Sequence, residues 1–185
     1  MARKLEAEAV ELGAYNNCVV HGLLQTRDYA RAILNARRPG FTEEEVEQQV
    51  AARLARQEIL DLMTGQRFFS LVQCESTLRR PIGGRMVMRQ QLERLLEVAQ
   101  WRNVDLQVLP LDREENSGTD GSFRLLRLKD GATVAFSEAP LSSRVMTGPK
   151  ETTIFDIRYG VLRAQALSPQ DSSTFIGKVL GETRT

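Results

Sequence analysis

The residues of this chain that could carry out chemistry gather between positions 18 and 38, a stretch that holds the only histidine and one of the two cysteines. Cys18 lies three positions before His21. A nucleophilic site needs a base beside a thiol or hydroxyl, so this pair could act together if the turn between them brought the side chains into contact. We expect instead that Cys18 is a small buried residue and that His21 lies at the surface or at a hinge.

Two glutamates follow predicted strands and are the other candidates for a site. Glu75 and Glu138 each end a strand, where ligands bind in open α/β sheets. Two carboxylates there could bind an amine, divide acid and base roles, or form ion pairs with Arg79 or Arg80. The ion pair is the most common of these outcomes, and ligand binding is the alternative.

A basic cluster surrounds the Gly83-Gly84 turn, which opens a predicted helix. It contains Arg79, Arg80, Arg85 and Arg89. A helix N-terminus with such arginines can bind an anion. Arginines on a solvated helix face are nevertheless the ordinary interpretation, and the turn lacks a P-loop pattern.

Composition excludes several function classes. The 185 residues include 25 basic and 24 acidic side chains, a net charge of +1, which is too small a positive excess for direct nucleic-acid binding. No apolar run approaches the roughly 20 residues that span a bilayer. One histidine and two isolated cysteines give no metal-ligand spacing, so we expect no metal and no cofactor, and reduced thiols in the cytoplasm.

Residues 1–63 are predicted to be helical. The expected helices are Lys4–Leu12, one that begins near Arg27, and Glu43–Leu62. Gly13 is expected to end the first helix and Thr26 to cap the second. Thr42 and Glu45 have the spacing of a capping box for the third.

Residues 64–140 are predicted to form the sheet. The expected strands are Arg67–Cys74, Val104–Pro110, Ser122–Leu128 and Thr133–Ser137. A helix from Arg85 to Trp101 lies between the first two strands, which indicates a parallel βαβ unit. The Asp130-Gly131 pair is typical of a hairpin between the last two.

Two helices are predicted within residues 149–182. The first covers Lys150–Leu167 with Ile154, Ile157, Val161 and Leu162 facing inward, and the second, Pro169–Leu180, is capped by Ser168. The whole chain, residues 1–185, is then one α/β (α+β) domain. Its mixed sheet has three to five strands, one βαβ unit and one hairpin, after a helical N-terminal third.

Motifs along almost the whole chain resemble one family. They are G-L-L-Q-T-x-x-Y-A-R-A from Gly22, R-L-A-R-Q from Arg53, E-S-T-L-R-R-P-I-G-G from Glu75, Q-L-E-R-L-L-E from Gln91, V-D-L-Q-V-L-P from Val104, G-S-F from Gly121 and L-R-A-Q-A-L-S-P from Leu162. They resemble a domain of unknown function that usually follows an Xre-type helix-turn-helix in actinobacterial regulators, which include WhiJ-like and antitoxin-like proteins. The chain departs from that pattern at His21, where the family usually has proline, and at E-N-S-G-T-D, where the family usually has a histidine-containing loop.

The resemblance implies a non-enzymatic sensory domain of a transcriptional regulator, with no DNA-binding domain in this chain. It would bind a small partner protein or a small ligand in a crevice lined by His21, Gln25, Glu75 and Glu138, with Arg79 and Arg80 nearby, and could form a homodimer. The alternative is a stand-alone enzyme or small-molecule binder of specialised metabolism. In it His21 acts as acid or base with Glu75 or Glu138 as its partner.

Overall fold

The structure is a computed structural model that describes residues 2–60, 67–137 and 144–183. The described strands form a six-stranded mixed sheet in the order β3-β2-β1-β4-β5-β6. Its strands are β1 (Ala9–Asn16), β2 (Phe68–Cys74), β3 (Val104–Leu109), β4 (Phe123–Leu128), β5 (Thr133–Ser137) and β6 (Arg144–Met146). The α/β class is confirmed, but the sheet has more strands than the three to five expected.

The central strand β1 was missed in the sequence, where a helix was expected over residues 4–12. Helix α1 (Ala2–Glu8) ends early, and β1 pairs in parallel with β2 and antiparallel with β4. Those two neighbours supply the ladder hydrogen bonds that override a helical preference. Gly13 does not end a helix: a Cβ there would lie 2.8 Å from Cε1 of Tyr159, so glycine lets that ring lie against the strand.

Four predicted strands are confirmed as β2, β3, β4 and β5. The parallel pairing of β2 with β3 across α5 (Arg85–Val98) is the expected βαβ unit, and β4 and β5 form the expected antiparallel hairpin. Glu75 does not end β2; it begins the short helix α4 (Glu75–Arg79).

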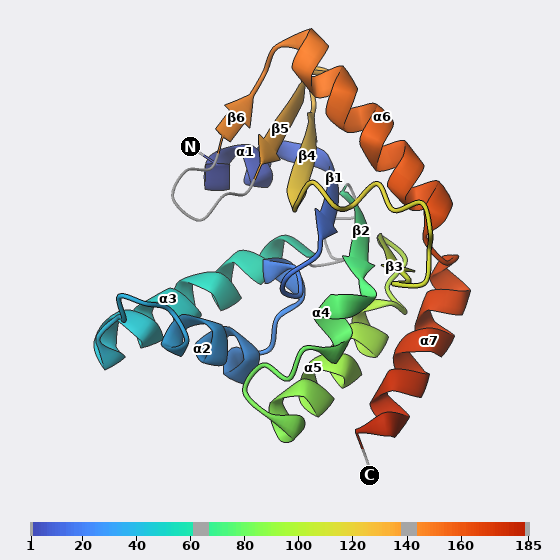
Figure 1. Ribbon diagram of the computed structural model, residues 1–185. Helices are drawn as coiled ribbons and strands as arrows, with labels where there is room; N and C mark the ends of the chain where they lie inside the picture. Colours follow the sequence, from blue (N-terminus) through green and yellow to red (C-terminus); the bar gives the residue numbers. More distant parts are fainter. Residues whose placement is uncertain (1, 61–66, 138–143, 184–185) are drawn as a thin grey trace.

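Helices cover both faces of the sheet (Figure 1). On one face the apolar side chains of β1, β2 and β3 pack against α5 and against Ile176 and Val179 of α7 (Pro169–Glu182). On the other face Tyr15 and Phe123 pack against Tyr159 and the rest of α6 (Pro149–Gln165). The sheet therefore buries two separate apolar layers.

Helix α6 faces the sheet through a different stripe from the one predicted. Leu162 is buried as expected, but Ile154, Ile157 and Val161 are 58%, 63% and 41% exposed. The apolar residues of this helix lie on two faces, and the face that contains Tyr159 and Leu162 is the one that packs on the sheet. The outward isoleucines and valine were placed wrongly because sequence periodicity alone does not say which stripe meets a partner.

Helices α2 (Arg27–Asn35) and α3 (Glu43–Arg56) form a hairpin that extends away from the sheet (Figure 1). Thr26 caps α2, and Thr42 with Glu45 makes the predicted capping box of α3. The third predicted helix is shorter than expected, because its last described turn is the 3₁₀ helix η2 (Gln57–Leu60). A second 3₁₀ turn, η1 (Gly22–Leu24), joins β1 to the hairpin.

Candidate functional site

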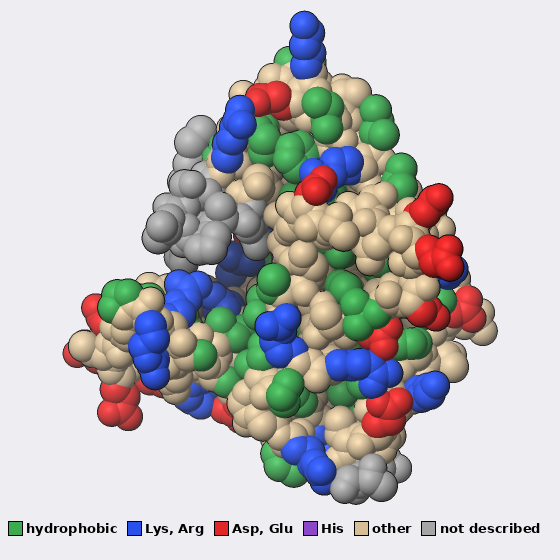
Figure 2. Space-filling view, viewed as in Figure 1, with side chains coloured by type: hydrophobic (Ala, Val, Ile, Leu, Met, Phe, Trp, Pro, Cys, Tyr) green, Lys and Arg blue, Asp and Glu red, His purple; other side chains and the backbone are tan. Residues whose placement is uncertain are grey.

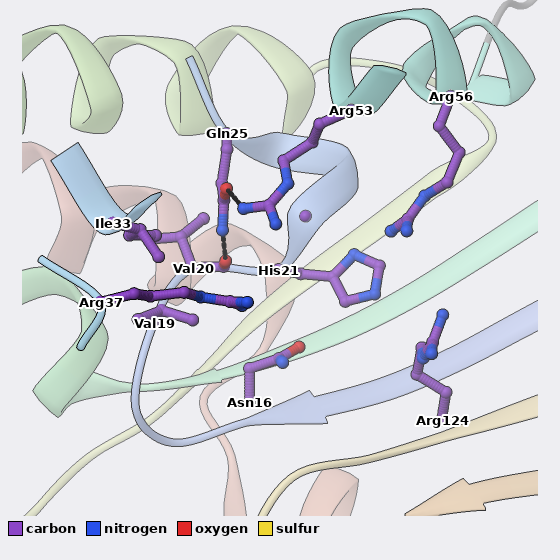
Figure 3. A pocket seen from close by; sticks show the side chains of 11 residues that line it. Asn16, Val19, Val20, His21, Gln25, Ile33, Arg37, Arg53, Arg56 and Arg124 are labelled. Carbon is purple, nitrogen blue, oxygen red and sulfur yellow. Dashed lines mark hydrogen bonds between the residues drawn. The ribbon is translucent and has the colours of Figure 1, made fainter. Parts of the chain in front are cut away.

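A cavity of about 180 Å³ lies where the end of β1, η1, α2 and α3 meet the sheet. Its described lining consists of Asn16, Val19, Val20, His21, Gly22, Gln25, Ile33, Arg37, Arg53, Arg56 and Arg124. The side chains of Arg53, Arg56 and Arg124 extend toward the cavity from α3 and β4, and Arg37 enters from the end of α2 (Figure 3). Four arginines and no carboxylate are found among these lining residues.

A buried carboxylate lies behind two of the arginines. Oε2 of Glu6 is 3.1 Å from Nε of Arg56, and Oε1 of Glu6 is 3.1 Å from Nη1 of Arg124. The side chain of Glu6 is only 2% exposed, and that of Arg124 only 12%. One glutamate from α1 therefore bridges α3 and β4, through a charge-assisted hydrogen bond from Arg124 and an ion pair with Arg56.

His21 lies at the centre of this arrangement, with its ring between Arg56 and Arg124 (Figure 3). It is 2% exposed, so the expectation of a surface or hinge residue was wrong, and no histidine is visible on the face shown in Figure 2. Burial lowers the pKa of His21 well below the usual histidine value, and the charges of Arg124, Arg56 and Arg53 lower it further. The imidazole is therefore neutral at pH 7.

The neutral ring has a defined orientation. Its Nδ1 accepts a hydrogen bond from the backbone N–H of Leu23 at 3.4 Å, which places the proton on Nε2. The backbone N–H of His21 donates to Oε1 of Gln73 on β2 at 3.2 Å. Residue 21 is thus attached to the sheet and to η1 at once, and it presents an N–H donor rather than a positive charge.

Glutamine side chains hold the rest of the lining. Gln25 donates to the carbonyl of Val20 at 2.5 Å and accepts from Nη1 of Arg53 at 2.6 Å. Gln57 donates to the carbonyls of Gly22 and Gln25 at 3.1 and 2.7 Å, which attaches η2 to this turn. These hydrogen bonds fix the conformation of the backbone around the cavity.

Gly22 also shapes the cavity by its lack of a side chain. A Cβ at this position would lie 2.9 Å from Nη2 of Arg56. Its φ is not in the left-handed region, since the described residues with such a φ are Gly83, Gly84, Gly121 and Gly131. The glycine of the G-L-L-Q-T motif therefore leaves room for the close approach of the Arg56 guanidinium.

The predicted site residues divide into two groups. His21 and Gln25 line the cavity as expected. Glu75 and Arg79 instead form an ion pair of 2.6 Å, and Arg79 also contacts Glu182 of α7 at 2.6 Å. This matches the predicted ion pair of Glu75.

Three further predictions concern residues that do not line this cavity. Arg80 is exposed beside the Arg79 ion pairs. Glu138 lies outside the described residues. Cys18 is exposed rather than buried, so it does not form the small core residue that we expected beside His21.

Sequence analysis missed Glu6, Arg53, Arg56 and Arg124. Arg53 and Arg56 are three positions apart on α3 and therefore share a helix face, which was a usable signal. Arg124 interrupts the apolar alternation of β4, and its guanidinium also lies 5.3 Å from the ring centroid of Phe136. Arg124 is only 12% exposed within its strand, so its charge needs a partner nearby. That partner, Glu6, is 118 positions away, and sequence spacing does not reveal the pair.

The described residues contain no group of three His, Cys, Asp or Glu side chains that could hold a metal ion. None of the described helices has the length and apolar character to cross a bilayer. Positive and negative side chains are interspersed on the face shown in Figure 2. Positive charge is thus not concentrated over that face, whereas four arginines line the cavity.

Comparison with known proteins gives one match. A family model described as "Domain of unknown function (DUF5753)" matches residues 2–178. No curated protein and no solved structure matches the chain. The match covers the sheet, the helical hairpin, the cavity and most of α7, and the chain belongs to the DUF5753 family.

Proposed function

We propose that this chain is the effector-binding, sensory domain of an Xre-type, WhiJ-like transcriptional regulator, and that its effector is a small anionic molecule. The observation that carries the proposal is the cavity lined by four arginines and by no described carboxylate. The resemblance of the motifs to domains that follow a helix-turn-helix supplies the regulatory context.

The donor set favours a carboxylate or phosphate group. Guanidinium groups match the oxygens of these anions with paired N–H donors, and such charge-assisted contacts are stronger than neutral hydrogen bonds. The neutral His21 adds a single N–H donor, and Gln25 fixes Arg53 so that less freedom is lost on binding. Each feature suits an anion and none suits a cation.

The size of the cavity favours a compact ligand. Its volume of about 180 Å³ is below the roughly 300–1,000 Å³ of pockets for drug-sized molecules. Of the two ligands that the sequence left open, a small molecule fits a cavity of this volume better than a partner protein does. Chain segments of a partner protein would need an open groove.

The same geometry favours binding over catalysis. A lowered pKa makes the His21 imidazole a weak base, and Nδ1 already accepts from the Leu23 N–H. Glu75, one proposed partner of His21 in an enzyme, is paired with Arg79. The ligand would then act by population shift: its differential affinity for two arrangements of a dimer would alter the spacing of attached DNA-binding domains.

The proposal is tested by titration calorimetry with inorganic phosphate and with succinate. Arg53→Met removes a cavity guanidinium and should weaken binding of the preferred anion by about tenfold or more. Arg89→Met is the matched control, because Arg89 is a half-exposed arginine on α5 that pairs with Glu93 at 3.0 Å. Absence of saturable binding by either anion, or equal weakening by both substitutions, would contradict an anion site in this cavity.

A further inference from the structure

The bridging carboxylate of Glu6 shows what the two central arginines accept. Its two oxygens contact Arg56 and Arg124 at 3.1 Å each, so a carboxylate already lies between the guanidinium groups that line the cavity. A ligand carboxylate or phosphate that enters the cavity meets the same two guanidinium groups. The protein thus holds, in its own chain, a group with the chemistry of the proposed ligand.

Helix α1 carries Glu6 and is short. It has seven residues and packs on β1 and β4, with Leu5 partly buried against the core. Arg67 donates to the carbonyl of Ala7. The pairing of β1 with β4 is irregular between Ala9 and Glu11, directly after the helix. A seven-residue helix is not stable alone, so its position depends on contacts such as those of Glu6.

We propose that Glu6 is an internal competitor of the ligand: the incoming anion takes Arg56 and Arg124 from the Glu6 carboxylate, and α1 is released from the sheet. This inference rests on the proposed function, because it requires an anion in the cavity. It adds how binding of the ligand in the cavity would change the position of the N-terminal helix.

The exchange replaces contacts of similar kind. The anion takes over the hydrogen bond that Glu6 accepts from Arg124 and the ion pair that it makes with Arg56, and the Glu6 carboxylate returns to water instead of remaining buried. The ligand also reaches the Nε2–H of His21 and the guanidinium of Arg53, which Glu6 does not contact in the structure. Those additional donors favour the ligand, and they make release of α1 depend on its concentration.

Hydrogen exchange of the wild-type chain tests this directly. The measurement compares the amides of residues 2–8 without ligand and with saturating succinate or inorganic phosphate. The inference predicts faster exchange of these amides with the bound anion, while the amides of β2 and β3 keep their protection. A response to only one of the two probes would identify the ligand group as carboxylate or phosphate.

The variant Glu6→Gln provides a second test, because the inference predicts an increase in anion affinity and not a loss. A neutral amide competes poorly for two guanidinium groups, so anion affinity should rise by about tenfold. Glu11→Gln is the matched control: Glu11 is nearby on β1, but it pairs with Arg127 at 3.6 Å on the surface, and its replacement should leave the affinity unchanged.

Two results would overturn the inference and leave the proposed function intact. In the first, anion binds but the amides of residues 2–8 keep or gain protection. In the second, Glu6→Gln weakens binding, as expected if Glu6 positions the arginines for the ligand. The exchange experiment uses the wild-type chain and decides the matter even if the variant fails to fold. If neither anion binds to the wild type, the inference and the proposed function both fail.

Discussion

Two arginine-centred sites in this molecule differ in charge balance and exposure. At the junction of α4 and α7, Arg79 is 38% exposed and is held by two carboxylates, Glu75 and Glu182. In the cavity, Arg56 and Arg124 share the single carboxylate of Glu6 beside Arg53 and Arg37. The first site has its charges matched at the surface and serves to attach α7. The second brings four arginines to one cavity, and its bridging carboxylate is buried, so loss of a partner there should cost more than at the surface.

The largest effect should follow from Arg124→Ala, because it removes one partner of a buried ion pair. Glu6 keeps only its contact with Arg56, and we expect a loss of about 3 kcal/mol in the free energy of unfolding, measured by urea denaturation. Glu6→Gln combined with Arg124→Met should be less destabilising than the sum of the single changes. Additive effects would show that the two residues are not energetically coupled.

Gln25→Leu tests the hydrogen bonds that hold the cavity lining, and it should reduce the free energy of unfolding somewhat less than Arg124→Ala does. The substitution leaves the carbonyl of Val20 and the guanidinium of Arg53 without the bonds that Gln25 makes. Loss of a buried hydrogen-bond partner should cost about 2 kcal/mol of unfolding free energy. Gln48→Leu is a useful control, since Gln48 is exposed on α3 and bonds only to Glu44 in a helical pair. A comparable loss in the control would contradict a special role for Gln25.

The pH dependence of stability should report His21, the only histidine. Its pKa is lowered in the folded chain, so between that pKa and the unfolded value of about 6.5 the unfolded chain binds more protons. Stability is therefore complete above about pH 6.5 and falls as the pH decreases, by up to about 1.4 kcal/mol per pH unit.

His21→Asn keeps a side-chain acceptor for the Leu23 N–H and has no group that titrates in this range. Thermal denaturation between pH 5 and pH 7.5 should show a flatter profile for this variant. An unchanged slope would assign the pH dependence to other groups and would remove the evidence for a buried neutral imidazole.

The smallest effect is expected at the matched surface site. Arg79→Ala breaks two ion pairs of 2.6 Å, but the side chains of Arg79 and Glu182 are 38% and 46% exposed. Solvent screening limits the loss to about 0.5 kcal/mol of unfolding free energy, and anion affinity at the cavity should not change. A loss as large as that of Arg124→Ala would erase the distinction between the two sites.

Sequence reasoning identified the elements whose evidence is local. Thr26, Thr42 with Glu45, and Ser168 make the predicted caps because each hydrogen bond joins residues three positions apart. Apolar segments of strand length and the Asp130-Gly131 hairpin signal also predicted β2 to β5. By contrast β1 was taken for part of a helix, because its strand conformation comes from pairing with β2 and β4, which lie far along the chain.

The same division applies to the site. The sequence by itself determined the motif around His21 and Gln25 and the capped hairpin that follows. The tertiary structure decided that His21 is buried and neutral, and that Glu6, Arg56 and Arg124 meet from α1, α3 and β4. The physical reason is that the pKa of a side chain and the pairing of buried charges depend on distance and on exclusion of water, and residues 118 positions apart acquire both only when the sheet has formed.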